Sequence, residues 1–149
     1  MKTITAAVFS LVVGSVHQVS AGGDWTTLLV MSGTKVAEVE GATRVDIPTA
    51  KSMFNDGHLF VDVQGFYEYR ASHVPGAILG ASITETELAD VAEKTKPIVF
   101  YCECDTGSAT CNLSPKASAK AVSWGFEKVY FFTDYDQWKA AGHPTETGS

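Results

Sequence analysis

Residues 97–102 read Pro-Ile-Val-Phe-Tyr-Cys, a short apolar run that ends in a thiol. Apolar runs of this kind, rich in β-branched and aromatic residues, are typical of strands buried on both faces of a parallel sheet. Pro97 fits the first position of such a strand, where a missing N–H is tolerated. Cys102 therefore lies just past the carboxyl end of the predicted strand, the edge at which open parallel sheets bind their ligands.

Strands and helices alternate along the chain on either side of this run. Further strands are predicted at 43–47, 59–63, 78–83 and 129–132, and helices at 48–54, 84–95, 114–124 and 134–141. The alternation, with the most apolar strands in the middle, predicts an α/β domain whose central, mostly parallel sheet has helices on both faces.

Polar residues mark where several of these helices begin. Ser, Thr and Asp accept hydrogen bonds from the first free N–H groups of a helix, and a Glu or Gln three residues later can reach back to the cap. Three such starts are predicted: the capping box Thr84/Glu87, the N-cap Ser114 followed by Pro115, and the capping-box pair Asp134/Gln137.

The first 21 residues have the layout of a secretory signal peptide. Lys2 precedes an apolar stretch, and Val19-Ser20-Ala21 supplies small residues at the cleavage positions. The stretch is shorter than the ~20 residues that span a bilayer, so we expect cleavage and no membrane association afterwards. The expected organisation is a signal peptide (1–21), an N-terminal extension (22–41) and one domain (42–147), in a periplasmic or secreted protein.

The charge balance argues against polyanionic partners. Asp and Glu number 17 against 11 Lys and Arg, a formal net charge of −6, and no basic cluster offsets this. Nucleic acid is therefore not an expected partner.

The three cysteines, Cys102, Cys104 and Cys111, leave alternatives open. Cys102 is the candidate nucleophile, with Cys104 or Cys111 as an auxiliary or resolving thiol. A structural Cys104–Cys111 disulfide suits an oxidising compartment and is compatible with that role. A soft-metal site is disfavoured because this spacing lacks a clear fourth ligand, so neither a metal nor a cofactor is expected.

The loop after Cys102 leads into the predicted helix at Ser114. Backbone N–H groups and the positive end of that helix are expected to stabilise Cys102 as thiolate, the nucleophilic form. The predicted substrate-facing residues are Glu103, Asp105, Thr106, Gly107, Ser108 and Ser114.

Six segments, in this order, resemble a rhodanese-type sulfurtransferase domain over about residues 42–145. The segments are 59–64, Glu68-Tyr69, 73–77, 97–102, 114–130 and 138–144. The resemblance implies a rhodanese-like fold and a persulfide on Cys102 that passes to a thiophilic acceptor. The implied partners are a small sulfur donor or acceptor, or a protein persulfide or thiol. Asp62, in a buried strand, and His73, in a loop, are interpreted as structural.

The loop departs from the family pattern in length and charge. Ser114 follows Cys102 by twelve positions, no Lys or Arg lies between them, and Glu103 and Asp105 are present. Carboxylates near a thiol raise its pKa and repel anions, so thiosulfate is predicted to be a poor donor. The nearest base along the chain is Lys116.

A second resemblance gives an alternative function. The segment Cys111-Asn112-Leu113-Ser114 is similar to part of a paired-cysteine motif in periplasmic rhodanese-like proteins that accompany quinoprotein dehydrogenases. The alternative is a non-enzymatic binding module, or a thiol–disulfide redox module, that accompanies a periplasmic oxidoreductase system.

Overall fold

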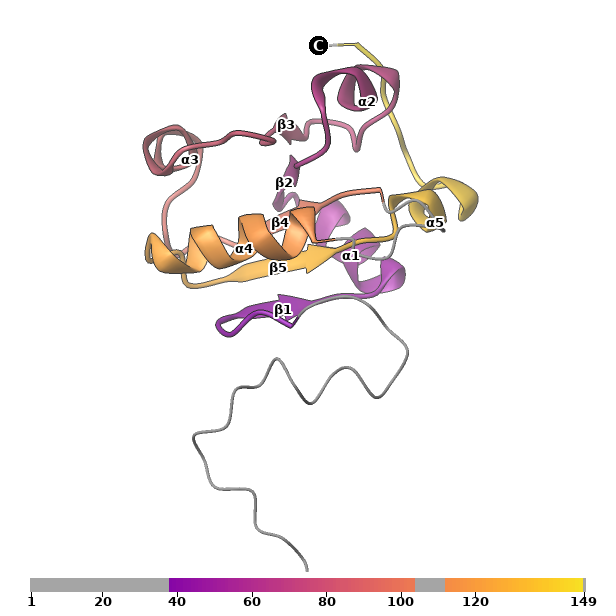
Figure 1. The fold of residues 1–149 in the computed structure, drawn as a ribbon. Helices are drawn as coiled ribbons and strands as arrows, with labels where there is room; N and C mark the ends of the chain where they lie inside the picture. Colours follow the sequence, from indigo (N-terminus) through magenta and orange to yellow (C-terminus); the bar gives the residue numbers. More distant parts are fainter. Residues whose placement is uncertain (1–37, 104–111, 149) are drawn as a thin grey trace, which may run out of the picture.

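The computed structural model describes residues 38–103 and 112–148. Within them a single five-stranded sheet, parallel throughout, forms the centre of the fold (Figure 1). Its strand order is β1-β5-β4-β2-β3. The strands are β1 (Ala42–Arg44), β2 (Leu59–Asp62), β3 (Ile78–Leu79), β4 (Ile98–Tyr101) and β5 (Val129–Phe132).

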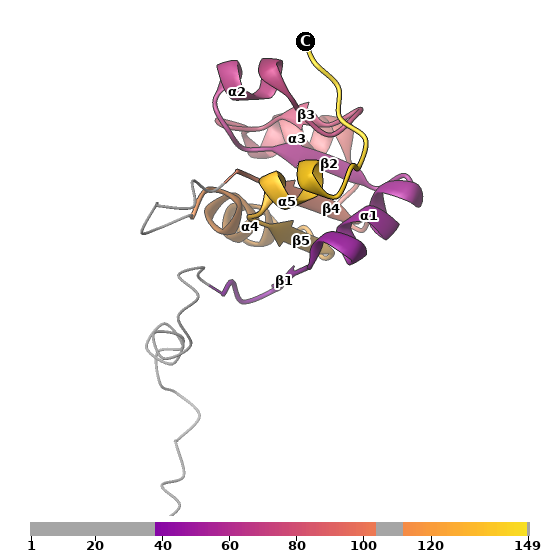
Figure 2. The ribbon, with the colours of Figure 1, turned by 90° about the vertical axis from the view of Figure 1, so that its right-hand side faces the viewer.

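Helices cover both faces of the sheet, as the alternation of elements predicted (Figure 2). One face packs against α1 (Ile47–Asn55) and α5 (Tyr135–Ala140), and the other against α3 (Glu85–Val91) and α4 (Leu113–Ser123). The short helix α2 (Phe66–Ala71) follows β2 and has no buried residue. It therefore has no apolar periodicity from which the sequence could predict it.

Side chains of the central strand β4 alternate between the two faces of the sheet. Val99 and Tyr101 belong to the cluster with α1 and α5, whereas Ile98, Phe100 and Cys102 belong to the cluster with α3 and α4. This period of two continues one residue past the strand. It directs the Cys102 thiol toward α4.

The predicted helix starts at Thr84 and Asp134 are confirmed, and at α3 the predicted capping box forms as well. At α3, Thr84 Oγ1 accepts from the N–H of Glu87 at 3.3 Å, and the Glu87 carboxylate accepts from the N–H of Thr84 at 2.8 Å. The α3 helix nevertheless ends at Val91 and not near 95.

The predicted N-cap of α4 was wrong, and at α5 the N-cap was correct but the predicted capping box does not form. At α4 the N-cap is Asn112, so Ser114 lies inside the first turn. Asp134 is the N-cap of α5 but makes no side-chain capping bond, because its carboxylate faces Arg44 across the sheet edge at 3.5 Å. Both side chains are occupied by tertiary contacts.

The predicted domain 42–147 contains every described helix and strand, while the predicted signal peptide and most of the extension lie outside the described residues. Within the described part of the chain, none of the helices is long and apolar enough to cross a bilayer.

Candidate active site

The candidate site lies at the carboxyl ends of β4 and β2. These strands are neighbours, but the chain leaves β4 toward β5 and leaves β2 toward β3, in opposite directions across the sheet. Ligands of open α/β sheets generally bind at the carboxyl edge where such a reversal occurs. Cys102 follows one of these strands and Gln64 follows the other shortly after its last residue, Asp62.

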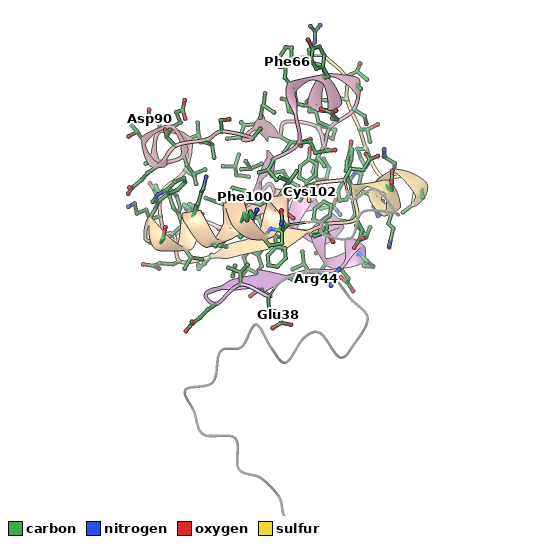
Figure 3. All side chains as sticks on the ribbon, in the orientation of Figure 1. Glu38, Arg44, Phe66, Asp90, Phe100 and Cys102 are labelled. Carbon is green, nitrogen blue, oxygen red and sulfur yellow. The ribbon has the colours of Figure 1, made fainter. Side chains whose placement is uncertain are left out.

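Cys102 is fully buried at this edge, between the starts of α4 and α5 (Figure 3). Its Sγ lies 3.3 Å from the hydroxyl oxygen of Ser114, and its carbonyl oxygen accepts from the N–H of Tyr135 at 3.3 Å. The Ser114 hydroxyl in turn donates to the carbonyl of Phe132 at 3.0 Å. The thiol is thus held by a buried side chain of α4, and its backbone is anchored to α5.

The sequence predicted that the start of α4 stabilises the Cys102 thiolate and so lowers the thiol pKa, but in the structure the pKa is raised. Burial raises the pKa of the Cys102 thiol, and the negative charges of Asp62 and Asp134 raise it further. The hydroxyl and backbone N–H of Ser114 act in the opposite direction but are outweighed. Loss of hydration penalises the charged form more than the hydroxyl and N–H of Ser114 favour it.

Glu103 points to the other side of the sheet from the thiol. Its carboxylate accepts a hydrogen bond from Lys139 Nζ of α5 at 2.7 Å. The base that faces the start of the loop therefore comes from the last helix and not from Lys116. Glu103 is therefore an ion-paired carboxylate, and its partner lies 36 positions away along the chain.

Asp62 organises the end of β2. One of its carboxylate oxygens accepts from the N–H of Gln64 at 2.9 Å, and the other from the Gln64 side-chain amide at 3.3 Å. Burial raises the Asp62 pKa, although these bonds and one from Tyr101 oppose the shift. This geometry agrees with a structural role, and the Asp62 charge also reaches the Cys102 thiol.

His73 ties the loop before β3 to the end of the chain. Its ring nitrogens lie 2.7 Å from the Tyr69 carbonyl oxygen and 3.1 Å from the Glu146 carboxylate. The ring also stacks on Tyr69 at a centroid distance of 3.9 Å. Both nitrogens have partners, as expected for a histidine that satisfies neighbouring groups.

Six residues of the predicted site fall outside the described residues: Cys104, Asp105, Thr106, Gly107, Ser108 and Cys111. Their roles, including the Cys104–Cys111 disulfide, stay predictions. Among the residues that the structure does describe, no cluster of three His, Cys, Asp or Glu side chains suits a metal ion.

Sequence reasoning missed Lys139 and Tyr135. The spacing of Asp136 and Lys139 is a visible helical i, i+3 pair, and their distance of 3.0 Å bears that signal out. The contact of Lys139 with Glu103 joins residues 36 positions apart, and no local pattern indicates it.

An all-parallel α/β sheet with a cysteine after its central strand is the architecture of rhodanese-like domains. The family model described as Rhodanese-like domain matches residues 46–141, and the chain belongs to this family. The matched range lies within the predicted domain 42–147.

Three relatives illustrate the similarity. The chain is 38% identical over 92 residues to the HTH-type transcriptional regulator Rv0324 of Mycobacterium tuberculosis; the match covers 60% of this chain but 38% of the regulator's length. Among solved structures, the BH2092 protein from Bacillus halodurans has a TM-score of 0.60 at 26% identity, covering 70% of this chain and 77% of that one. The Alr3790 protein from Anabaena sp. has a TM-score of 0.57 at 25% identity, covering 70% and 92%.

Proposed function

We propose that the protein carries sulfur as a persulfide on Cys102 and transfers it to a thiophilic acceptor. The observation that carries the proposal is the position of Cys102 at the carboxyl end of β4, beside β2, with the Ser114 hydroxyl 3.3 Å from its sulfur. Membership of the rhodanese-like family supports the same chemistry.

The reaction needs no external oxidant or reductant. The Cys102 thiol first loses its proton to solvent, and the thiolate attacks the outer sulfur of the donor. A new S–S bond forms on Cys102 while the donor's own bond to that sulfur breaks, and the donor leaves with the electron pair. In the second half, the acceptor attacks the outer sulfur of the persulfide and regenerates the Cys102 thiolate.

The proposal places this chemistry outside the cytoplasm, with residues 1–21 removed on export. The small residues at 19–21 and the single charge at Lys2 support that assignment. The proposed partners are a small sulfur compound or a protein persulfide as donor, and a thiol or another thiophile as acceptor.

Intact mass spectrometry tests the proposal directly. After incubation with a sulfane-sulfur donor and removal of excess reagent, the wild type should gain one sulfur atom and Cys102→Ser none. Cys104→Ser/Cys111→Ser serves as the matched control and should still gain it. Retention of the added sulfur in Cys102→Ser would overturn the assignment of the nucleophile.

The burial and raised pKa of the Cys102 thiol favour a second candidate, a non-catalytic binding or thiol–disulfide module. In that case, incubation with the donor adds no sulfur to the wild type. Mild oxidation instead lowers the mass by two hydrogen atoms, because two cysteines form a disulfide. Reduction of that disulfide by dithiothreitol restores the original mass.

A further inference from the structure

Lys139 occupies the centre of a charge cluster that includes Glu103, the residue that follows the candidate nucleophile. Its ammonium lies 2.7 Å from the Glu103 carboxylate, 3.0 Å from that of Asp136, and 5.2 Å from the centroid of the Tyr135 ring. The hydrogen bond to Glu103 is the main cause that raises the Lys139 pKa, so the amine is firmly charged. Two carboxylates around one ammonium leave the cluster with a net charge of −1.

Backbone hydrogen bonds fix this cluster to the cysteine segment. Glu103 directly follows Cys102 and pairs with Asp134 in an isolated antiparallel bridge. The N–H of Tyr135 donates to the Cys102 carbonyl at 3.3 Å. Lys139 follows Tyr135 by one helical turn, so α5 presents it at the side of the Cys102 segment opposite to Ser114.

The cluster is open to solvent, unlike the thiol. The Lys139 and Glu103 side chains are 34% and 35% exposed, whereas Cys102 is fully buried. A charged molecule that approaches the carboxyl edge of β4 therefore meets these charges from the solvent side. At this exposure their effect is moderate and depends on salt.

We propose that Lys139 and Glu103 together set which sulfur donors the site accepts. While Glu103 and Asp136 neutralise Lys139, the negative cluster disfavours donors with two negative charges relative to donors with one. Release of Lys139 from Glu103 provides a cation for a dianionic donor. This inference rests on the proposed function, and it makes Glu103 and Lys139 specificity determinants that need not touch the reacting sulfur.

Two donors with the same reacting group isolate this charge effect. Thiosulfate carries two negative charges and methanethiosulfonate carries one. Each delivers its outer sulfur to the Cys102 thiolate; the S–S bond of the donor breaks, and sulfite or methanesulfinate leaves with the electron pair. The ratio of the two rates of sulfur gain, followed by intact mass, is the measured quantity.

In 20 mM buffer, Glu103→Gln should raise the ratio of the thiosulfate rate to the methanethiosulfonate rate on the order of fivefold, and Lys139→Gln should lower it by a similar factor. The double variant should return close to the wild-type ratio, because the cation that Glu103→Gln releases is then absent. About 0.5 M salt should remove most of these differences. Glu85→Gln is the matched control and should leave the ratio unchanged. It breaks a similar ion pair, that of Glu85 with Lys94 at 2.8 Å, far from Cys102, because Lys94 also contacts the Trp124 carbonyl at the opposite end of α4.

Asp136→Asn is a second variant that keeps the test valid if Glu103→Gln, a change next to Cys102, disturbs folding. It removes the second carboxylate around Lys139 and should raise the same ratio. This inference is overturned if the ratio of the two rates is unchanged in both Glu103→Gln and Asp136→Asn. It is also overturned if the raised ratio of Glu103→Gln persists in the double variant, which lacks Lys139. The proposed function stands in either case. No sulfur gain by the wild type from either donor overturns both.

Discussion

The hydroxyl of Ser114 lies between two buried partners, 3.3 Å from Cys102 Sγ and 3.0 Å from the Phe132 carbonyl oxygen. A hydroxyl has one proton, and here it donates that proton to the carbonyl, so it accepts from the neutral thiol. To donate to a thiolate, Ser114 must turn away and leave the buried carbonyl without this bond. The resting arrangement therefore suits a protonated Cys102, and the Ser114 hydroxyl lowers the pKa of the thiol only when it turns to donate to the sulfur.

The first prediction concerns the pH at which Cys102 reacts. Because burial raises the pKa of the thiol above its ordinary value of 9.0, alkylation by iodoacetamide should rise with pH and reach its midpoint above that value. Rates measured in a Cys104→Ser/Cys111→Ser background report Cys102 alone. Asp134→Asn should move the midpoint to lower pH, because it removes a negative charge that disfavours the thiolate.

Glu127→Gln is the control for this shift, since Glu127 is an exposed acid before β5, at the opposite edge of the sheet. A wild-type midpoint well below 9 would mean that the start of α4 dominates over burial, as the sequence alone suggested.

The second prediction follows from the raised pKa of Asp62. The folded protein holds this proton more tightly than the unfolded chain, so the contribution of Asp62 to the free energy of unfolding falls as pH rises from 3.8 through the folded pKa. Each pH unit inside that window costs about 1.4 kcal/mol. Asp62→Asn lacks this titration while its side-chain oxygen can still accept from the Gln64 N–H.

Urea unfolding of both proteins between pH 3.5 and 7 measures the difference. The stability of the wild type relative to Asp62→Asn should decline with pH across the window and then level off. A constant difference would show that Asp62 titrates alike in the folded and unfolded chains.

The strands and the position of Cys102 were predictable because they depend on local apolar runs. The same local reasoning failed where a distant partner decides the outcome. Asp134 has the sequence of a capping box with Gln137, but Arg44, far away along the chain, takes its carboxylate. The thiol pKa shows the same limit, since a helix beginning near Ser114 was visible in the sequence and the burial of Cys102 was not.

The third prediction concerns the contact between Glu146 and the loop before β3. The Glu146 carboxylate accepts from the N–H of Gly76 at 2.7 Å and lies 3.1 Å from His73 Nε2. The bond from Gly76 lowers the Glu146 pKa, so its contribution to stability is present above 4.5 and is lost as pH falls through the folded pKa. Glu146→Gln should weaken this contact at neutral pH and should remove that part of the acid sensitivity.

Hydrogen exchange of the Gly76 and His73 amides at pH 7 checks this contact. Both amides should exchange faster in Glu146→Gln, whereas Glu93→Gln, a change at another exposed acid, should leave them unaffected. Equal protection in the wild type and Glu146→Gln would mean that the backbone pairing of residues 73 and 146 suffices without the carboxylate.

The last prediction compares two serines on the buried face of α4. Ser118 lies one turn after Ser114 and is fully buried, but among the described residues its hydroxyl has no hydrogen-bond partner. Ser118→Ala removes an unsatisfied polar group and improves helix propensity, so it should stabilise the fold by about 1 kcal/mol. Ser114→Ala leaves the Phe132 carbonyl without its donor and should destabilise the fold by about 1–3 kcal/mol. Urea unfolding of the two variants tests this directly, because the same substitution in the same helix is expected to have opposite signs. Loss of stability in Ser118→Ala would indicate that its hydroxyl is satisfied, for example by a buried water.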